Sequence, residues 1–231
     1  MRLYPIMMNL DGKQVIVIGG GLVAARKIMG LLETGALITV ISPKIEQSLE
    51  KLAGEERIEW IAKPFVASLL DGYSEAALIF GATNQREVNL NIHEAALTRK
   101  IPCNIADVPD LCTFVVPAVF TQGELMIAVT TGGSSPALAR RIREDLEKRF
   151  GPEYAELTRV LGELRKVVLK AGGASAENRK LFMEIVDSEV LTALREKDRE
   201  KVLAILRTIL PDYIDPQAAI EEDPHRLVPE G

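Results

Sequence analysis

The sequence predicts an α/β protein, in which a doubly wound parallel sheet is followed by a hairpin and helix and then by a small C-terminal helical domain. Short β-branched runs alternate with stretches of helical periodicity up to about residue 110, which is typical of βαβ units. A glycine-rich loop, Gly19-Gly20-Gly21, separates the first run from the first helical stretch. After residue 150 the periodicity is helical throughout. We therefore expect a Rossmann-like sheet with an all-helical end.

The strands of the parallel sheet are expected where apolar runs are continuous. Gln14–Ile18 (QVIVI) is β-branched along its whole length, as expected for a strand that is buried on both faces. Leu37–Ile41 (LITVI) has the same character. Further strands are predicted at residues 58–62, 76–81 and 101–106.

Helices are expected between these strands. Residues 22–34 place Ala24, Ile28 and Leu31 on one face, and Gly35 is a typical helix end. Residues 44–53 and 87–99 also have helical patterns. Because crossovers between parallel strands are right-handed, these helices should cover both faces of the sheet.

The pattern changes after the fifth strand. Residues 114–120 and 124–131 flank a turn at 121–123 and predict a hairpin. A helix is expected at 137–150, with Ser134 or Ser135 as its cap and Pro136 at its first position. Further helices are predicted at residues 154–170, 176–186, 188–196 and 198–210, and the prolines and acids after residue 210 predict a loose end.

Composition and charge exclude several classes of protein. Lys and Arg number 28 against 33 Asp and Glu, so the net charge of −5 argues against a nucleic-acid partner. Two cysteines exclude a disulfide scaffold, and without any metal-ligand spacing we predict no metal site. The apolar runs are too short to cross a bilayer, and the first residues lack the pattern of a signal peptide. We expect a cytoplasmic protein without membrane contact.

The glycine loop predicts a dinucleotide site, because it fits G-x-G-x-x-A between a strand and a helix. Gly19 permits the tight turn, and Gly21 lets a pyrophosphate approach the backbone. The phosphates would lie at the helix N-terminus, where free N–H groups favour anions. The alternative is a glycine turn without a ligand.

The ends of the second and fourth strands should meet the same cofactor. An acid that binds the ribose is expected at the end of the second strand, but Ser42-Pro43-Lys44 stands there. Ser42 can bond a ribose hydroxyl and Lys44 can favour a 2′-phosphate, so these residues leave NAD and NADP equally open. Thr83 and Asn84 follow the fourth strand and are placed to meet the cofactor, although Asn84 can equally cap the next helix.

A second group of residues points to an acidic substrate. Asp107 follows the fifth strand, near the expected nicotinamide, where a buried carboxylate can act as a general base. The alternative is a turn aspartate before Pro109. Arg140 and Arg143 lie on adjacent turns of a helix and can grip a carboxylate, or they form a solvated face. The loop before that helix predicts an anion site made of Thr131, Gly132, Gly133, Ser134 and Ser135.

A set of motifs occurs in order along residues 1–150: LYPI at 3–6, GGGLVAARK at 19–27, NIAD at 104–107, TFVVP at 113–117 and TGGSSPALAR at 131–140. In this order they resemble the precorrin-2 dehydrogenase family, the dehydrogenase and ferrochelatase part of siroheme synthase. The resemblance implies oxidation of precorrin-2 to sirohydrochlorin with NAD⁺ in siroheme biosynthesis. Some members of the family also insert Fe²⁺, as a substrate.

The resemblance also implies roles for individual residues. Asp107 would be the key catalytic residue, and the cofactor contacts would include Leu22, Val23, Pro43 and Lys44. Thr131 stands where some relatives have serine. The substrate contacts would be Asn104, Thr113, Phe114, Arg140 and Arg143 with the loop 131–135.

The resemblance further implies a homodimer built through the hairpin region. The expected organisation is an NAD-binding Rossmann domain at residues 1–113, a dimerisation region at 114–150, a helical domain at 151–215 and a flexible tail at 216–231. Two alternatives stay open at this point. One is a non-catalytic, dimeric redox sensor that binds NAD, and the other is an NADP-dependent reductase of another acid.

Overall fold

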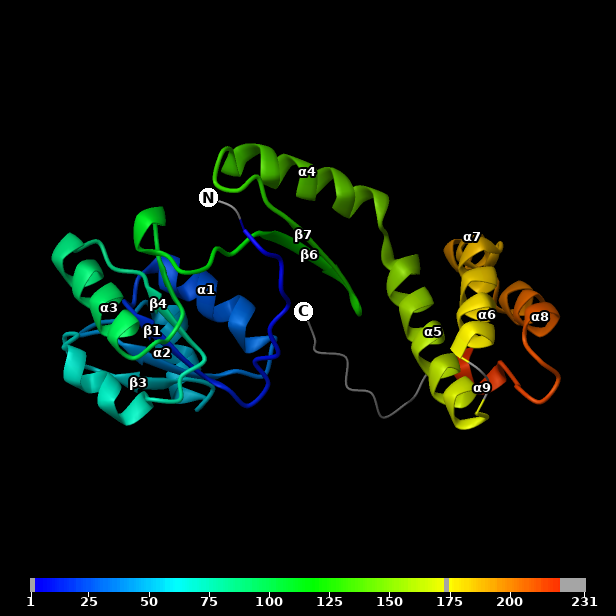
Figure 1. The fold of residues 1–231 in the computed structure, drawn as a ribbon, viewed down its shortest axis with the longest axis horizontal. Helices are drawn as coiled ribbons and strands as arrows, with labels where there is room; N and C mark the ends of the chain where they lie inside the picture. Colours follow the sequence, from blue (N-terminus) through cyan, green and yellow to red (C-terminus); the bar gives the residue numbers. More distant parts are fainter. Residues whose placement is uncertain (1–2, 173–174, 221–231) are drawn as a thin grey trace. The chain divides into compact units, whose positions relative to one another are not determined.

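The computed structural model describes residues 3–172 and 175–220 of the chain. It divides into two compact units, the first ending at Val116 and the second beginning at Pro117 (Figure 1). This boundary lies a few residues after the one expected from the sequence. Within the described part of the chain, every helix is too short or too polar to cross a lipid bilayer.

The first unit contains a five-stranded parallel sheet with the order β3-β2-β1-β4-β5. Its order reverses beside β1, which pairs with β2 on one side and with β4 on the other. The strands are β1 (Gln14–Ile18), β2 (Leu37–Ile41), β3 (Glu59–Ile61), β4 (Leu78–Gly81) and β5 (Cys103–Ile105). The connecting helices are α1 (Leu22–Leu32), α2 (Gln47–Gly54) and α3 (Arg86–Thr98), with 3₁₀ turns η1 (Ala67–Tyr73) and η2 (Pro109–Leu111).

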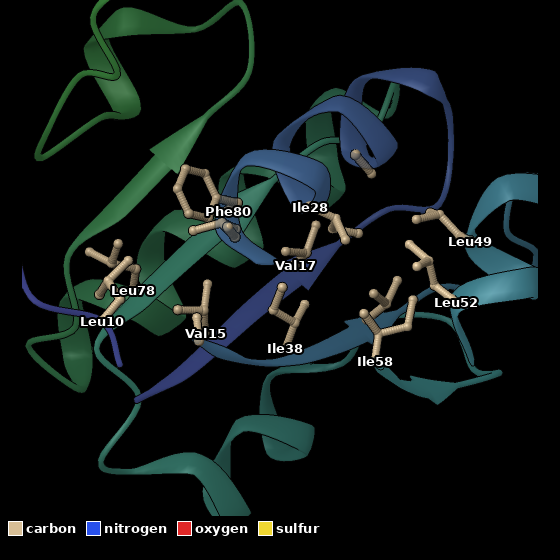
Figure 2. Close-up of a cluster of buried hydrophobic side chains, with 14 residues drawn as sticks. Leu10, Val15, Val17, Ile28, Ile38, Leu49, Leu52, Ile58, Leu78 and Phe80 are labelled. Carbon is tan, nitrogen blue, oxygen red and sulfur yellow. The ribbon is translucent and has the colours of Figure 1, made fainter. Parts of the chain in front are cut away.

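Helices cover both faces of this sheet. Val17 of β1 packs in a core with Ile28 of α1, whereas its neighbour Ile16 packs in another core with Ile92 of α3. Successive side chains of a strand point to opposite faces, so the doubly wound prediction is confirmed. The first core is labelled in Figure 2 at Leu10, Val15, Val17, Ile28, Ile38, Leu49, Leu52, Ile58, Leu78 and Phe80.

The predicted bounds are met in full for β1 and β2 and are too long for the other strands. In β1 and β2 every residue of the apolar run pairs in the sheet, and all but the first residue of each strand are buried. At the start of β4, by contrast, Ala76 donates to the carbonyl of Tyr73 in a turn. Before β5, Lys100 has a φ of 57° and ends α3 as a turn residue. Because these turns also contain apolar residues, the apolar run in the sequence is longer than the strand in the structure.

The second unit begins with an antiparallel hairpin of β6 (Ala118–Gln122) and β7 (Leu125–Val129). The predicted first strand began too early, at residue 114, and the predicted turn at 121–123 is wrong. Pro117 has no N–H to give to a ladder, so the strand begins after it. The turn is Gly123-Glu124, because Gly123 takes a φ of 58°, which suits a two-residue hairpin turn.

Helices form the rest of the second unit. The first of them, α4, packs on both strands of the hairpin. Leu157, Leu164 and Leu206 are fully or almost fully buried where the later helices pack on each other. The helices are α4 (Pro136–Arg149), α5 (Pro152–Lys170), α6 (Ser175–Asp187), α7 (Val190–Arg195), α8 (Arg199–Ile209) and α9 (Gln217–Ile220).

The expectation of a loose end after residue 210 is wrong for residues 214–220. Ile214, Ala219 and Ile220 are buried in the helical core. Arg159 and Arg199 both donate to the carbonyl of Ile220. Apolar side chains and satisfied carbonyls therefore anchor α9, in spite of the nearby prolines. Residues 221–231, the remainder of the predicted tail, lie outside the described residues.

Candidate functional site

A cavity of about 710 Å³ opens in the first unit, where the parallel strands end. Its wall is formed by the loops that follow β1, β2, β4 and β5, together with Pro64 and Phe65 after β3. In open α/β sheets, ligands bind outside the carboxyl ends of the strands, where the strand order reverses. The volume of this cavity falls in the range of roughly 300–1,000 Å³ that is usual for ligand pockets.

The structure brings together every residue that was predicted to bind the cofactor. They come from separate loops and line this cavity along with Asp107, and their individual roles stay predictions. The residues predicted to bind the cofactor are Gly19, Gly21, Leu22, Val23, Ser42, Pro43, Lys44, Thr83 and Asn84.

The three glycines of the loop have different surroundings. A Cβ on Gly19, whose φ is 114°, would lie 2.3 Å from the carbonyl oxygen of Ala82. A Cβ on Gly20 would lie 2.2 Å from the carbonyl oxygen of Lys44. A Cβ on Gly21 would meet nothing within 4 Å. Gly19 and Gly20 therefore allow the loops to pack, whereas Gly21 leaves open space.

That open space suits a dinucleotide. Gly21 is the N-cap of α1, and the first-turn amides of a helix have no partner within the helix. A pyrophosphate could approach these amides closely, since no side chain stands in front of Gly21. The residues present therefore fit the predicted cofactor. The packing role of Gly20 was not expected, because the motif allows any residue between the two glycines.

Two hydrogen bonds from side chains to backbone carbonyls hold the loop after β2. The Ser42 hydroxyl donates to the carbonyl of Lys44 at 2.7 Å, and the Ser42 carbonyl accepts from the indole of Trp60 at 2.9 Å. The proton of the Ser42 hydroxyl is therefore engaged, and only its lone pairs remain for a ribose. Sequence reasoning missed Glu46, an acid that lines the cavity beside this loop. It is the N-cap of α2, some residues after the strand end where an acid was sought.

The two polar residues of the loop after β4, Thr83 and Asn84, have different surroundings. The Thr83 hydroxyl donates to Oδ1 of the buried Asn89 at 2.8 Å, and the Asn89 amide donates back to the Thr83 carbonyl at 3.1 Å. Asn84 is exposed at the cavity. The N-cap of α3 is Gln85, so the alternative in which Asn84 caps this helix is wrong.

Asp107 belongs to the cavity wall and has an unusual backbone. Its φ is 60°, in the left-handed region that non-glycine residues rarely adopt. The Ala106 amide on one side of it donates to the carbonyl of Gly81 at 2.8 Å. The side chain is exposed in the single chain, whereas the general-base interpretation assumed burial. A ligand that covers Asp107 would have to supply that burial.

Asn104, Thr113 and Phe114 are not among the residues that line the cavity. The amide nitrogen of Asn104 donates to the carbonyl of Phe114, and its oxygen accepts from the ammonium of Lys27. The Thr113 hydroxyl bonds both backbone groups of Cys103. Phe114 packs edge-on against Phe80 with ring centroids 5.4 Å apart. These contacts hold the wall behind Asp107 and provide no support for a substrate role.

The loop 131–135 belongs to the second unit. The Thr131 hydroxyl accepts from the amide of Ser135 and donates to its carbonyl, both at 3.0 Å. The Ser135 hydroxyl accepts from the amide of Leu138, which confirms a serine cap for α4. Gly132 and Gly133 have positive φ angles and are exposed, as is Ser134.

The two arginines of the predicted substrate site form ion pairs within α4. Arg140 bonds Glu144 at 2.9 Å, and Arg143 pairs with Glu144 and Glu147. The pKa of Glu144 is lowered mainly by the hydrogen bond from Arg140, and the positive charges of Arg140 and Arg143 lower it further. The Arg140 side chain is 77% exposed, and exposed pairs contribute little to stability. The ion pair with Glu144 therefore leaves most of the Arg140 side chain open to solvent.

Sequence comparisons point to one family. Residues 6–118 match the family described as "Putative NAD(P)-binding", and residues 122–149 match the family described as "Sirohaem biosynthesis protein central". A siroheme synthase of Methylobacillus flagellatus is 35% identical over 211 residues, which are 89% of this chain and 44% of that protein. A siroheme synthase of Methylococcus capsulatus is 34% identical over 88% of this chain and 43% of its own length. The chain thus spans less than half the length of these relatives.

A solved structure agrees with these matches over most of the chain. SirC, a precorrin-2 dehydrogenase, superposes with a TM-score of 0.73 and 28% sequence identity. The match covers 90% of this chain and 98% of SirC. The similarity therefore extends through the sheet, the hairpin region and the helices. The described residues, 3–172 and 175–220, contain no group of three or more His, Cys, Asp or Glu that could hold a metal ion.

Proposed function

This chain belongs to the family of siroheme synthases and precorrin-2 dehydrogenases, and we propose that it oxidises precorrin-2 to sirohydrochlorin with NAD⁺ in siroheme biosynthesis. The observation that carries the proposal is the cavity of the first unit. There the predicted cofactor residues and Asp107, drawn from separate loops, share one wall. SirC, a precorrin-2 dehydrogenase similar to this chain over 98% of its length, supports the choice of substrate.

The first task of the chain is to hold the cofactor. NAD⁺, when bound, accepts the electron pair and one hydrogen that the substrate loses. The first-turn amides of α1 bind its pyrophosphate, and Gly21 gives the phosphates room. The loop Ser42-Pro43-Lys44 and the residues Thr83 and Asn84 border the remaining space.

The second task is to remove a proton. Oxidation of precorrin-2 takes two hydrogens from the ring, one with the electron pair and one as a proton. Asp107 is the carboxylate that we assign to accept the proton, because it lies in the wall of the cofactor cavity. A positioned general base typically contributes about 10²–10⁴-fold to a rate.

The third task is to bind a substrate that carries many carboxylates. We assign this task to α4 and to the loop before it. Arg140 is mostly exposed, and Gly132, Gly133 and Ser134 are exposed at the N-terminal end of the helix. Free amides and a positive helix end favour anions, and arginine suits carboxylates through its paired N–H groups.

We further infer that the protein acts as a homodimer in the cytoplasm. Val119 and Met126 are 39% and 50% exposed on the face of the hairpin that also carries Thr121. A two-stranded sheet is marginal by itself, and an exposed strand edge invites pairing with another chain. A second copy of this chain would cover these side chains.

The deciding experiment is anaerobic incubation with precorrin-2 and NAD⁺, followed by absorbance spectra. Conversion to sirohydrochlorin is expected, and a chain that binds NAD⁺ but never turns over would instead be the redox sensor. Adding Fe²⁺ or Co²⁺ after oxidation tests chelation, in which Asp107 would accept the pyrrole protons and the macrocycle would be the metal's ligand. A parallel run with NADP⁺ and with Lys44→Ala tests the choice of cofactor.

A further inference from the structure

The residues around Asp107 form a closed loop. We call residues 106–112 the Asp107 loop, which leaves β5 and returns to its start. At its base the amide of Thr113 donates to the carbonyl of Cys103 at 2.8 Å, and the Thr113 hydroxyl accepts from the amide of Cys103 at 2.8 Å. These bonds fix the two ends of the loop. The conformation at Asp107 then depends on contacts made inside the loop.

The side chain that supports it is Cys112. The amide of Ile105 donates to its sulfur at 3.2 Å, and the thiol faces the carbonyls of Ile105 at 3.3 Å and Val108 at 3.4 Å. The amide nitrogen of Asn104 lies 3.6 Å from the same sulfur. One half-buried sulfur thus contacts the backbone on both sides of Asp107.

Asp107 needs such support because of its backbone. Its φ of 60° costs free energy in a residue with a Cβ, although Asp tolerates it better than most, and contacts from the surroundings offset this cost. The backbone bond that closes the turn, from the amide of Val108 to the carbonyl of Ile105, is long at 3.3 Å. The thiol contacts both of the residues that this bond joins.

We propose that Cys112 is a positioning residue for Asp107, whose carboxylate it keeps aimed into the cofactor cavity by bracing Ile105 and Val108 from inside the Asp107 loop. The inference rests on the proposed role of Asp107 as the base. Cys112 itself does not line the cavity, so it acts through the backbone and not on the substrate.

Cys103, which lies in β5 just before the Asp107 loop, offers a matched control. Its thiol contacts the carbonyl of Leu111 at 3.4 Å and Nδ1 of His93 at 3.7 Å, and neither residue adjoins Asp107. Cys103 is buried in β5, and this burial raises the pKa of its thiol. Replacing either cysteine by alanine removes one sulfur, but only one of the two braces the turn at Asp107.

The test is a double-mutant cycle in the full chain, using Cys112→Ala, Asp107→Asn and their combination, with Cys103→Ala as the control. We expect Cys112→Ala to lower kcat by roughly 10-fold or more, since a misplacement of about 1 Å can cost on the order of 100-fold. The dissociation constant for NADH should stay that of the parent. In the Asp107→Asn background the loss caused by Cys112→Ala should disappear, and Cys103→Ala should leave kcat unchanged.

An equal loss of kcat in both backgrounds would overturn the proposal, because Cys112 would then act independently of Asp107. A kcat that falls as far in Cys103→Ala would overturn it too. The same cycle with Cys112→Ser guards against an alanine variant that does not fold. Its hydroxyl keeps a donor and an acceptor, so we expect a smaller loss that also disappears with Asp107→Asn.

A second readout separates this inference from the proposed function. Amide hydrogen exchange at residues 106–108 should become faster in Cys112→Ala than in Cys103→Ala, whatever chemistry Asp107 performs. If Asp107→Asn keeps parental turnover while exchange is faster in Cys112→Ala, the assignment of the base fails and the brace stands. Unchanged exchange in Cys112→Ala would overturn the brace itself.

Discussion

The ammonium of Lys27 donates to the side-chain oxygen of Asn104 across 3.1 Å, which joins α1 to the last strand of the sheet. The same ammonium lies 5.1 Å from the centroid of the Phe80 ring. The helix that begins at the glycine loop is thereby tied to the strand that leads to Asp107. A cation held between an amide and an aromatic ring is partly removed from water, which makes its charged form less stable.

We predict that the stability contributed by Lys27 depends on alkaline pH. Burial lowers the pKa of Lys27 below its ordinary 10.5, and the neighbouring charge of Arg26 lowers it further. Between the lowered value and 10.5 the unfolded chain binds more protons than the folded one, so stability rises with pH in this window. In urea titrations from neutral pH upward, the parent should gain stability relative to Lys27→Met. A constant difference between the two proteins across the series would contradict the prediction.

The glycine loop should separate cofactor binding from folding. Gly21→Asp should abolish NADH binding, since its side chain would occupy open space and bring a negative charge to the pyrophosphate. Its melting temperature should stay close to that of the parent. Gly20→Ala should lower the melting temperature, because its Cβ would lie 2.2 Å from the carbonyl of Lys44. Binding can be followed by energy transfer to NADH from Trp60, the single tryptophan, which bonds the cavity loop at Ser42. Parental NADH affinity in Gly21→Asp would show that the loop is not the phosphate site.

Asp107→Asn should lower turnover of precorrin-2 by about 10²–10⁴-fold, the usual effect of losing a general base. The amide keeps the size of the side chain and can still accept a hydrogen bond. NADH affinity should be close to that of the parent, because the proposed phosphate site is formed by a different loop, at the start of α1. If more than about a tenth of the parental rate remains, the loss is smaller than the roughly 10²-fold minimum expected for a general base. Asp107 would then be only a turn residue.

Arg140→Ala should raise the KM for precorrin-2, because it removes a charged hydrogen bond to the substrate. Such a bond contributes roughly 1.5–3 kcal/mol to the free energy of binding. Arg141→Ala is a matched control, since Arg141 is 66% exposed and pairs with Asp145 on another side of the same helix. Its KM should be that of the parent. Equal effects of the two substitutions would indicate a general influence of charge and not a specific contact.

The exposed face of the hairpin should carry the dimer. Met126→Lys is expected to shift the protein from dimer to monomer in sedimentation at micromolar concentration, because a charge would be buried between the copies. Met183→Lys changes a methionine of similar exposure on α6, 52% against 50%, and should leave the assembly intact. A parent protein that sediments as a monomer would refute the proposed dimer.

Much of the site could be predicted because the fold constrains it. The carboxyl ends of parallel strands must meet at one edge, so the strand pattern is enough to place the loops after β1, β2, β4 and β5 at one site. Glu46, Pro64 and Phe65 were missed, since they follow neither the glycine motif nor a strand end directly. Asn104 and Thr113 were expected at the substrate, but their polar groups bond the backbone and Lys27.

Local patterns in the sequence are enough to predict the layered sheet, the glycine turn and the order of the loops around the cavity. These features depend on local periodicity and on the handedness of the crossovers, which neighbouring residues encode. Which polar groups bond each other, and which face the cavity, depends instead on the packing of the whole fold. Lys27 and Asn104 are 77 residues apart in the chain, and no local pattern indicates that one will bond the other. The different roles of Gly20 and Gly21, and the bracing of Asp107 by Cys112, are likewise set by atoms that meet only when the chain has packed.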